Sequence, residues 1–401
     1  MILAHKIRLR PTPKQEAYFR RACGTTRFTW NWALAEWQRQ YAAGEKPSGL
    51  SLKKRFNAIR REQFPWTYEV HRDCTARPFD HVQRAFQHFF RRVKAGQKPG
   101  YPRFKKKGKS RDSFYIANDK FAMQERCAKL PFVGAVRTRE PLRWSGKITG
   151  GTVRRDADAW FLVVQVDVGE LRRPRTAEGV VGVDLGIAMS MTLSTGEKIE
   201  GPRAIRVAMQ MLQRLSRQHA RKKKGSQNRR KAAERLARLH RRIANIRQDF
   251  LHKVTTRLVR ENQAVGIEDL NVQGMVRNRK LARSIQDEAF GEFRRQLTYK
   301  GPIWDSKIVV YPRFEPSSKK CSDCGEVIKQ LPLNVREWVC PACGVVHDRD
   351  VNAAMNLKQL GAASPEVTPV ERVALARTRV RVQPPSKKQE LAGAHLRAPE
   401  R

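Results

Sequence analysis

The sequence has few acidic residues for a chain of 401 residues, and its seven cysteines are too few for a disulfide scaffold. Its 38 Asp and Glu residues stand against 82 Lys and Arg residues, which gives a formal net charge of +44. Such an excess of one sign repels itself in a compact fold. A polyanion relieves this repulsion because it releases condensed counterions on binding. The composition therefore favours nucleic acid as the partner.

Long apolar runs are also missing from the sequence. No stretch approaches the roughly 20 residues that a bilayer span needs, and residues 1–15 lack the apolar segment of a signal peptide. We therefore expect no membrane partner and a cytoplasmic protein, in the cytosol or nucleoid of a prokaryote. The hydrophobic content of 40% is still enough for a sizeable core, so we expect two or three folded domains.

The cysteines are unevenly distributed, and four of the seven lie in two C-x-x-C pairs separated by fifteen residues. This spacing predicts a zinc site in which four thiolates surround the ion. Such a site is structural, because no position remains for water. Two disulfides are the alternative, which a cytosolic setting disfavours. The predicted ligands are Cys321, Cys324, Cys340 and Cys343. His347 follows them and is expected to be a polar surface residue, and the isolated cysteines Cys23, Cys74 and Cys127 to be buried or half-buried thiols.

The first part of the chain indicates a β-rich domain with helices inserted into it. Alternating apolar and basic residues predict a strand over 1–10, and short β-like runs over 127–168 predict a small antiparallel sheet or barrel. Apolar and aromatic residues at helical spacing predict helices between them, over 14–41, 51–62 and 78–94. In the last of these helices, one apolar stripe is expected to lie in the core: Val82, Ala85, Phe86, Phe89 and Phe90.

Two strongly basic segments are candidate nucleic-acid contacts. Residues 98–116 mix cations with aromatic rings, which suits a phosphate backbone and stacked bases, although a solvated basic loop is an equal alternative. Residues 203–262 predict a basic helical hairpin, interrupted at 222–228. The candidate contact residues are Tyr101, Arg103, Phe104, Lys105, Lys106, Lys107, Arg229 and Arg230.

Three acids in the second half stand at the ends of predicted elements. Asp184 ends one apolar strand, Glu268 ends a second, and Asp350 opens a helix after the cysteines. If the strands are neighbours and the helix packs beside them, the three carboxylates converge, and a divalent cation is their natural partner. Two such ions would activate water and stabilise the leaving oxygen of a phosphodiester. Gly182 and Gly186 are interpreted as leaving room for a phosphate or metal near the backbone.

The remaining C-terminal elements are a helix over 284–300, a strand over 307–311 and a final helix near the acid at 350. Residues 362–401 show little periodicity and are expected to be disordered.

Several short motifs, in this order, resemble the TnpB (OrfB) family of transposon-encoded, RNA-guided DNA endonucleases, which is related to type V CRISPR effectors. They cover nearly everything from residue 1 to about 360. The motifs are K-I-R-L-R-P-T, R-F-T-W-N-W-A-L, Y-P-R-F-K-K-K, G-V-D-L-G, G-I-E-D-L-N-V-Q-G-M, S-S-K-K-C-S-D-C-G and C-G-V-V-H-D-R-D-V-N-A-A-M-N-L.

The resemblance implies a multidomain α/β fold in which an RNase H-like (RuvC) nuclease domain, 178–320 and 348–361, is divided by a zinc ribbon, 321–347. It also implies a β-barrel wedge domain, 1–12 and 98–170, with a helical recognition domain, 13–97, inserted into it. By motif match, Asp184, Glu268 and Asp350 are the catalytic residues and bind Mg²⁺, for which Mn²⁺ can substitute. Asp350 is preferred over Asp348 because it directly precedes V-N-A-A.

The implied partners are a guide RNA transcribed from the transposon end and a double-stranded target DNA recognised beside a short motif. A separate transposase is expected to be encoded alongside. Three other functions stay open on the sequence alone. They are a nuclease-inactive RNA-guided repressor, a transposase that joins DNA ends with the same chemistry, and a plain zinc-ribbon DNA-binding protein.

Overall fold

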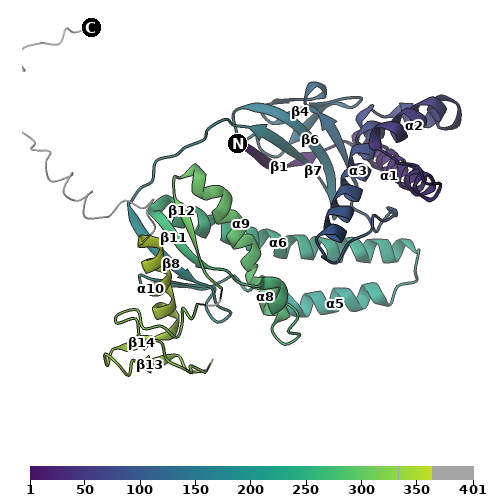
Figure 1. The fold of residues 1–401 in the computed structure, drawn as a ribbon. Coiled ribbons are helices and arrows are strands. Elements are labelled where there is room, and N and C mark those ends of the chain that lie inside the picture. The colour runs from purple at the N-terminus through teal and green to yellow at the C-terminus, as the bar shows by residue number, and fades with distance from the viewer. Residues whose placement is uncertain (314, 333, 364–401) are drawn as a thin grey trace, which may run out of the picture. The chain divides into compact units, whose positions relative to one another are not determined.

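The computed structural model describes residues 1–313, 315–332 and 334–363. It divides into two compact units. The first contains Met1–Leu171 and Ala208–Ala244, and the second contains Arg172–Val207 and the chain from Asn245 onward. Figure 1 shows their elements. Apart from 362 and 363, the tail expected to be disordered lies outside the described residues.

The first unit is built on a seven-stranded antiparallel sheet of order β2-β6-β7-β1-β5-β4-β3. The first strand of the chain lies inside the sheet, with Leu3 opposite Val166 and Ile7 opposite Leu162. The strand order runs from β2 at one edge of the sheet to β3 at the other. The strands are β1 Ile2–Arg10, β2 Ser113–Ala117, β3 Ala122–Gln124, β4 Cys127–Leu130, β5 Gly134–Thr138, β6 Lys147–Asp156 and β7 Ala159–Asp167.

Three helices stand between β1 and β2 in the sequence, as the predicted insertion requires: α1 Pro13–Ala42, α2 Gly49–Gln63 and α3 Asp73–Lys94. A capping box of Thr12 and Gln15 starts α1, because each side chain bonds the other residue's backbone N–H. The predicted start of α3 at 78 was wrong. The helix begins at Asp73 and contains Pro78, which removes only one backbone donor near the helix start.

The apolar stripe of α3 is only partly core. Val82 and Phe86 are buried, and Ala85 and Phe89 pack beside them. Phe90 is 42% exposed, so its assignment to the core was wrong. The last turns of the helix extend beyond the partners that cover its start.

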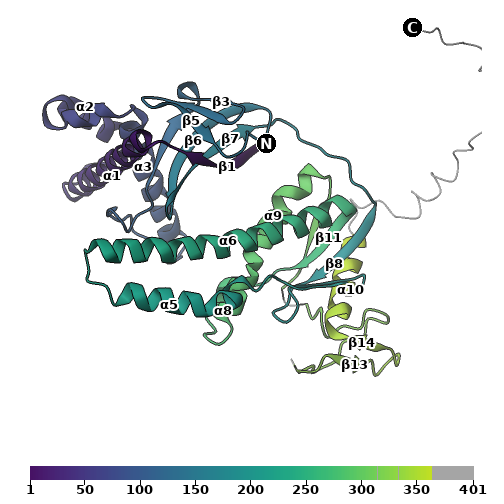
Figure 2. The ribbon, with the colours of Figure 1, turned by 180° about the vertical axis from the view of Figure 1, so that it is seen from behind.

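The predicted helical hairpin consists of α5 Met209–Ala220 and α6 Gln227–Glu261, which run side by side in Figures 1 and 2. All of α5 and the part of α6 up to Ala244 belong to the first unit. The predicted nuclease domain, by contrast, contained the whole hairpin. The Arg229 guanidinium donates to the carbonyl oxygen of Lys222 at 2.7 Å and so closes the turn between the two helices.

The second unit contains a five-stranded sheet of order β10-β9-β8-β11-β12. Its central strand β8 pairs in parallel with β11, which pairs in parallel with β12, while β9 and β10 continue the sheet antiparallel. The strands are β8 Gly179–Asp184, β9 Met191–Leu193, β10 Lys198–Ile199, β11 Asn262–Glu268 and β12 Lys307–Tyr311.

Helices pack on the sheet of the second unit. Val181, Val183, Val265 and Ile267 contact a core that includes apolar residues of α6 and α9. The intervening residues of these strands face α10 instead, because side chains alternate along a strand. The helices are α4 Ala204–Val207, α7 Val272–Met275, α8 Ala282–Glu288, α9 Phe290–Lys300 and α10 Arg349–Ala362.

The single helix predicted over 284–300 is two helices in the structure. Ala289 adopts a left-handed backbone conformation with φ of 55° and separates α8 from α9. Because an alanine pays a steric cost in this region, no residue type at this position announced the break.

Candidate metal centres

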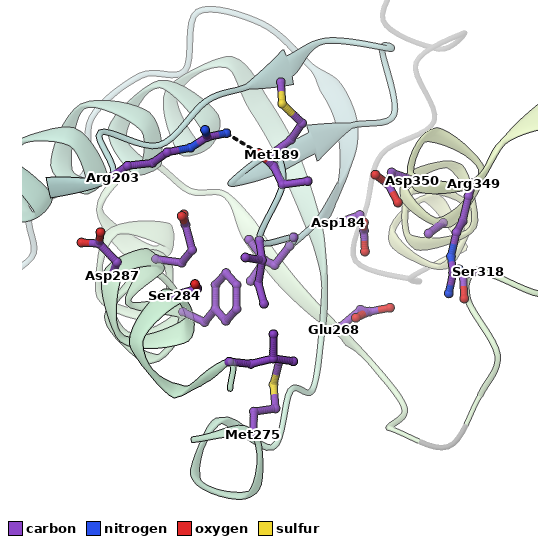
Figure 3. Close-up of a pocket in the computed structure, with 18 of the residues that line it drawn as sticks. Asp184, Met189, Arg203, Glu268, Met275, Ser284, Asp287, Ser318, Arg349 and Asp350 are labelled. Carbon is purple, nitrogen blue, oxygen red and sulfur yellow. Dashed lines mark hydrogen bonds between the residues drawn. The ribbon is translucent and has the colours of Figure 1, made fainter. Parts of the chain in front are cut away.

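The three predicted acids come together at one cavity of the second unit. Asp184 is the last residue of β8 and Glu268 the last of β11, and the two strands are parallel neighbours. Asp350 lies in the first turn of α10, which packs against both strands. All three side chains line the same cavity, and Figure 3 shows them around one space. The predicted convergence is therefore present.

Asp184 has a strongly perturbed carboxyl group. Burial raises its pKa well above the usual range, and the neighbouring carboxylates of Glu268 and Asp350 raise it further. Three ionised carboxylates in one half-buried cavity repel one another, and a divalent cation offsets this electrostatic free energy. Carboxylate oxygens are the ligands that hard cations such as Mg²⁺ prefer. The donor set therefore fits a divalent metal ion.

Two glycines allow α10 to approach the sheet closely enough to bring Asp350 to the other acids. Gly182 of β8 and Gly266 of β11 are paired in register. A Cβ atom on Gly182 would lie 1.8 Å from the carbonyl oxygen of Ala354, and one on Gly266 would lie 2.1 Å from that of Leu357. The interpretation of Gly182 as room for a phosphate or metal was wrong, because the helix occupies that space.

Asp348 and Asp350 have different roles in the structure. Asp348 caps α10, since its carboxylate accepts from the backbone N–H groups of Asp350 and Val351 at 3.0 and 2.9 Å. It also pairs with Lys198 at 2.6 Å. Asp350 lines the cavity instead. The geometry agrees with the preference for Asp350 as the candidate catalytic acid.

Sequence reasoning missed two polar neighbours of these acids. Arg336 lines the cavity and its guanidinium lies 3.4 Å from the carboxylate of Asp350. The hydroxyl of Ser317 donates to the carboxylate of Glu268. Arg336 lies outside the quoted motifs. Ser317 opens the motif S-S-K-K-C-S-D-C-G, but the motif gave no sign that this residue contacts Glu268, which lies 49 residues away in the sequence.

The four predicted zinc ligands also come together. Their sulfur atoms all lie within 4.8 Å of one another. Cys321 and Cys343 are 3.7 Å apart, and Cys324 and Cys340 are 3.6 Å apart. Hydrogen bonds from the backbone N–H groups of Cys343 and Ala342 lower the pKa of Cys340 to about 7, which favours the thiolate that zinc binds. The cluster is consistent with a zinc site.

The first C-x-x-C pair is fastened to α10 by three polar side chains on one face of the helix. Asn352 accepts from the backbone N–H of Ser322 at 2.9 Å and donates to the carbonyl oxygen of Lys320 at 2.8 Å. Asn356 donates to the same oxygen at 2.7 Å, and Gln359 donates to the carbonyl oxygen of Ser322 at 2.5 Å. The helix that carries Asp350 is thus tied to the cysteine cluster.

The remaining cysteine predictions are confirmed, and one histidine prediction is wrong. Cys23 and Cys74 are buried and Cys127 is half-buried. Burial also raises the pKa of the Cys23 and Cys74 thiols. His347 is 6% exposed and is therefore not a surface residue.

The basic and aromatic segment near residue 101 is anchored to α1. Trp30 donates to the carbonyl oxygen of Arg103 at 3.0 Å, and the ammonium group of Lys105 lies 4.0 Å from the centroid of the Trp30 ring. Burial lowers the pKa of Lys105 to about 8. Arg103, Phe104, Lys106 and Lys107 are exposed. Tyr101 is 48% exposed, and the centroid of its ring lies 5.2 Å from that of the Phe89 ring.

Comparisons with known proteins agree with this arrangement. A family model named OrfB_IS605 and described as "Probable transposase" matches residues 163–279, which include Asp184 and Glu268. A second, "Cas12f1-like, TNB domain", matches residues 290–357, which include the four cysteines and Asp350. A third, "Helix-turn-helix domain", matches residues 1–46, where the structure has β1 and α1.

Among curated proteins, a "Putative RNA-guided DNA endonuclease" of Streptomyces pristinaespiralis is 40% identical over 377 residues, which are 90% of each chain. This chain belongs to the TnpB (OrfB) family. Another TnpB relative, "Putative RNA-guided DNA endonuclease InsQ" of Escherichia coli K12, is 32% identical over 90% of this chain and 92% of its own length.

A solved structure extends the similarity to the fold. In the cryo-EM structure of a Cas12f1-sgRNA-target DNA complex, one chain matches this one with a TM-score of 0.52 and 14% identity. The match covers 88% of this chain and 84% of that chain. The TnpB chain therefore has a mixed α/β, multidomain fold that resembles Cas12f1. Among its described residues, no helix is long and apolar enough to cross a membrane.

Proposed function

We propose that this TnpB chain is an RNA-guided, metal-dependent DNA endonuclease carried by a transposon. It hydrolyses phosphodiester bonds of a target DNA next to a short sequence motif. The observation that carries the proposal is the convergence of Asp184, Glu268 and Asp350 on one cavity. The relatives described as putative RNA-guided DNA endonucleases support the guide RNA and the DNA substrate.

The chemistry follows from the three carboxylates. They would hold Mg²⁺, as two ions, with Mn²⁺ able to substitute. When bound, the metal supplies an activated water and a charge that stabilises the leaving oxygen of the phosphodiester. A bound cation would oppose the rise in the pKa of Asp184, because a metal ligand must be ionised. Arg336 lies beside Asp350 and offers a cation to the scissile phosphate.

The proposed domain architecture assigns an RNase H-like (RuvC) fold to 178–320 and 348–361. Three antiparallel strands followed by two parallel ones support it. Residues 321–347 form the zinc ribbon, which holds a structural Zn²⁺ through its four cysteines. A wedge domain of 1–12 and 98–170 carries the helical recognition domain of 13–97.

The proposed partners are a guide RNA from the transposon end and a double-stranded target DNA, and the activity belongs to the prokaryotic cytosol or nucleoid. A separate transposase is proposed to be encoded alongside. The net charge of +44 supports contacts to phosphates. Because Lys105 and Arg229 make internal contacts, we assign direct nucleic-acid contacts mainly to the other candidates: Tyr101, Arg103, Phe104, Lys106, Lys107 and Arg230.

The test is cleavage by the protein recovered with RNA after co-expression with its native transposon end. The complex is incubated with Mg²⁺ and a plasmid library that matches the bound RNA beside randomised flanks. Asp184→Ala is compared with wild type and with Asp249→Ala, which removes an exposed acid of α6. We expect guide-dependent cutting by wild type and Asp249→Ala, and none by Asp184→Ala.

The other functions predict different results. Tight binding of RNA and target without cutting by any variant would favour a guided repressor and overturn the catalytic assignment. Joining of DNA ends without a guide would favour a transposase. Recovery of wild type and both variants with equal amounts of RNA would exclude misfolding as the cause of lost cutting.

A further inference from the structure

His347 is buried beside the cysteine cluster, although the zinc ligands are complete without it. It lies on β14 (Val346–Asp348), opposite Trp338 of β13 (Glu337–Val339). The centroids of the two rings are 4.8 Å apart. A buried polar group needs a hydrogen-bond partner, because its desolvation otherwise costs free energy. The histidine must therefore have a partner within the cluster.

That partner is a zinc ligand. The Nε2 atom of His347 lies 3.0 Å from the sulfur of Cys321. The same nitrogen lies 3.7 Å from a carboxylate oxygen of Asp323, which is a longer and exposed contact. Nε2 therefore points at the thiolate of Cys321.

The distances distinguish a hydrogen bond from metal ligation. Two sulfurs bound about 2.3 Å from a tetrahedral zinc ion lie about 3.8 Å apart, and a bound sulfur and imidazole nitrogen lie about 3.6 Å apart. The cysteine pairs, at 3.7 and 3.6 Å, match the first value. The contact of 3.0 Å between His347 and Cys321 is shorter than the second. The four sulfurs fill the tetrahedron, and the histidine belongs outside it.

Cys321 has a physical need for such a donor. Four thiolates around Zn²⁺ carry a net charge of −2, and the Cys321 side chain is buried. Cys340 is also buried but is stabilised by two backbone N–H groups, from Cys343 and Ala342. At Cys321 one backbone N–H, that of Cys324, donates to the sulfur at 3.5 Å. A side-chain N–H from His347 supplies the stronger contact.

We propose that His347 is a positioning residue of the zinc site, which donates a hydrogen bond from Nε2–H to the Cys321 thiolate and slows the release of zinc. It is not a ligand, and its role does not depend on DNA cleavage. Trp338 holds the ring in place, so the donor is already oriented before the metal binds.

The test compares zinc release from the full-length protein and its variants. His347→Phe keeps a ring against Trp338 and removes the donor, while His347→Gln keeps a side-chain N–H. His240→Phe makes the same change at an exposed histidine of α6. Zinc content is measured by atomic emission, and release is followed with a chromogenic chelator. Replacing Zn²⁺ by Co²⁺ then reports the number of sulfur ligands in the absorption spectrum.

We expect His347→Phe to release zinc roughly 10- to 100-fold faster, because losing a hydrogen bond to a metal ligand typically lowers metal affinity by this factor. His347→Gln should lie closer to wild type, and His240→Phe should equal it. The Co²⁺ spectrum should indicate four sulfur ligands in every variant. Equal release rates in wild type and His347→Phe would overturn the proposal, as would a nitrogen ligand in the wild-type spectrum.

A second measurement does not depend on a variant that folds. In wild-type protein labelled with ¹⁵N-histidine and loaded with zinc, a protonated Nε2 of His347 supports the proposal and a metal-bound Nε2 contradicts it. If wild type holds no zinc at all, the zinc site itself fails, and this result is distinct from equal release rates.

Discussion

Replacing Gly182 with alanine tests whether the closeness of α10 to the sheet sets the position of Asp350. The new Cβ atom would lie 1.8 Å from the carbonyl oxygen of Ala354 and 2.5 Å from the backbone nitrogen of Lys358. Both are backbone atoms and cannot rotate away. To restore an ordinary contact of 3.4 Å, α10 must move by about 1.6 Å at Ala354. Asp350 lies one helical turn before this point and moves with the helix.

The expected effect on cleavage is large. A displacement of about 1 Å in a catalytic constellation costs on the order of 100-fold in rate. Overpacking also costs about 1–3 kcal/mol of folding free energy. We therefore expect Gly182→Ala to stay folded and bind RNA, but to cut its guided target at least roughly 100-fold more slowly in Mg²⁺.

Gly291→Ala is the matched control. Gly291 lies in α9, where a Cβ atom would meet nothing within 4 Å. Alanine in a helix is more favourable than glycine by about 0.5–1 kcal/mol, so this variant should be slightly more stable and cut normally. The assay is the single-turnover rate at saturating RNA, with a melting curve for each protein. If Gly182→Ala cut at the wild-type rate, the argument that helix contact positions Asp350 would be refuted.

Three further predictions concern other parts of the molecule. Removing zinc with a selective chelator, in excess Mg²⁺, should abolish cutting, and added Zn²⁺ should restore it. The reason is that Asn352 and Asn356 tie the cysteine cluster to α10, which carries Asp350. Full cutting activity without zinc would contradict this prediction. Phe90→Ala should weaken binding of single-stranded RNA by about 1–3 kcal/mol if its exposed ring stacks on a base, whereas the exposed control Leu50→Ala should not. Burial lowers the pKa of Lys300 to about 8, below its unfolded value of 10.5, so its contribution to stability rises with pH between these values. Lys300→Met should therefore melt with a smaller rise, or a steeper fall, in stability over pH 8–10 than wild type; an unchanged slope would contradict the assignment.

The residue types and their spacing in the sequence predict the donor atoms of both candidate metal centres. Paired C-x-x-C motifs predict a thiolate cluster because the spacing is local, and the structure brings the four sulfurs together. Asp184 and Glu268 could be paired from sequence because each ends an apolar strand, and parallel neighbouring strands end at the same edge. The short motifs spread along the chain predicted the family, and the comparisons confirm it.

Contacts between distant segments could not be predicted in this way. From the sequence, Gly182 was interpreted as room for a phosphate or metal, and only the packing of a helix that lies far along the chain shows why a side chain is excluded there. The burial of His347 and the exposure of Phe90 depend on which partner covers each residue, and local hydrophobicity predicts neither.

The difference between the features that could be predicted from the sequence and those that could not has one physical cause. Ligand spacing, strand ends and helix periodicity are properties of neighbouring residues, so the amino-acid sequence alone specifies them. Close packing and the partners of buried polar groups involve residues far apart in the chain. The second kind includes Arg336 beside Asp350, Ser317 beside Glu268 and His347 beside Cys321, and these contacts form only when the chain folds.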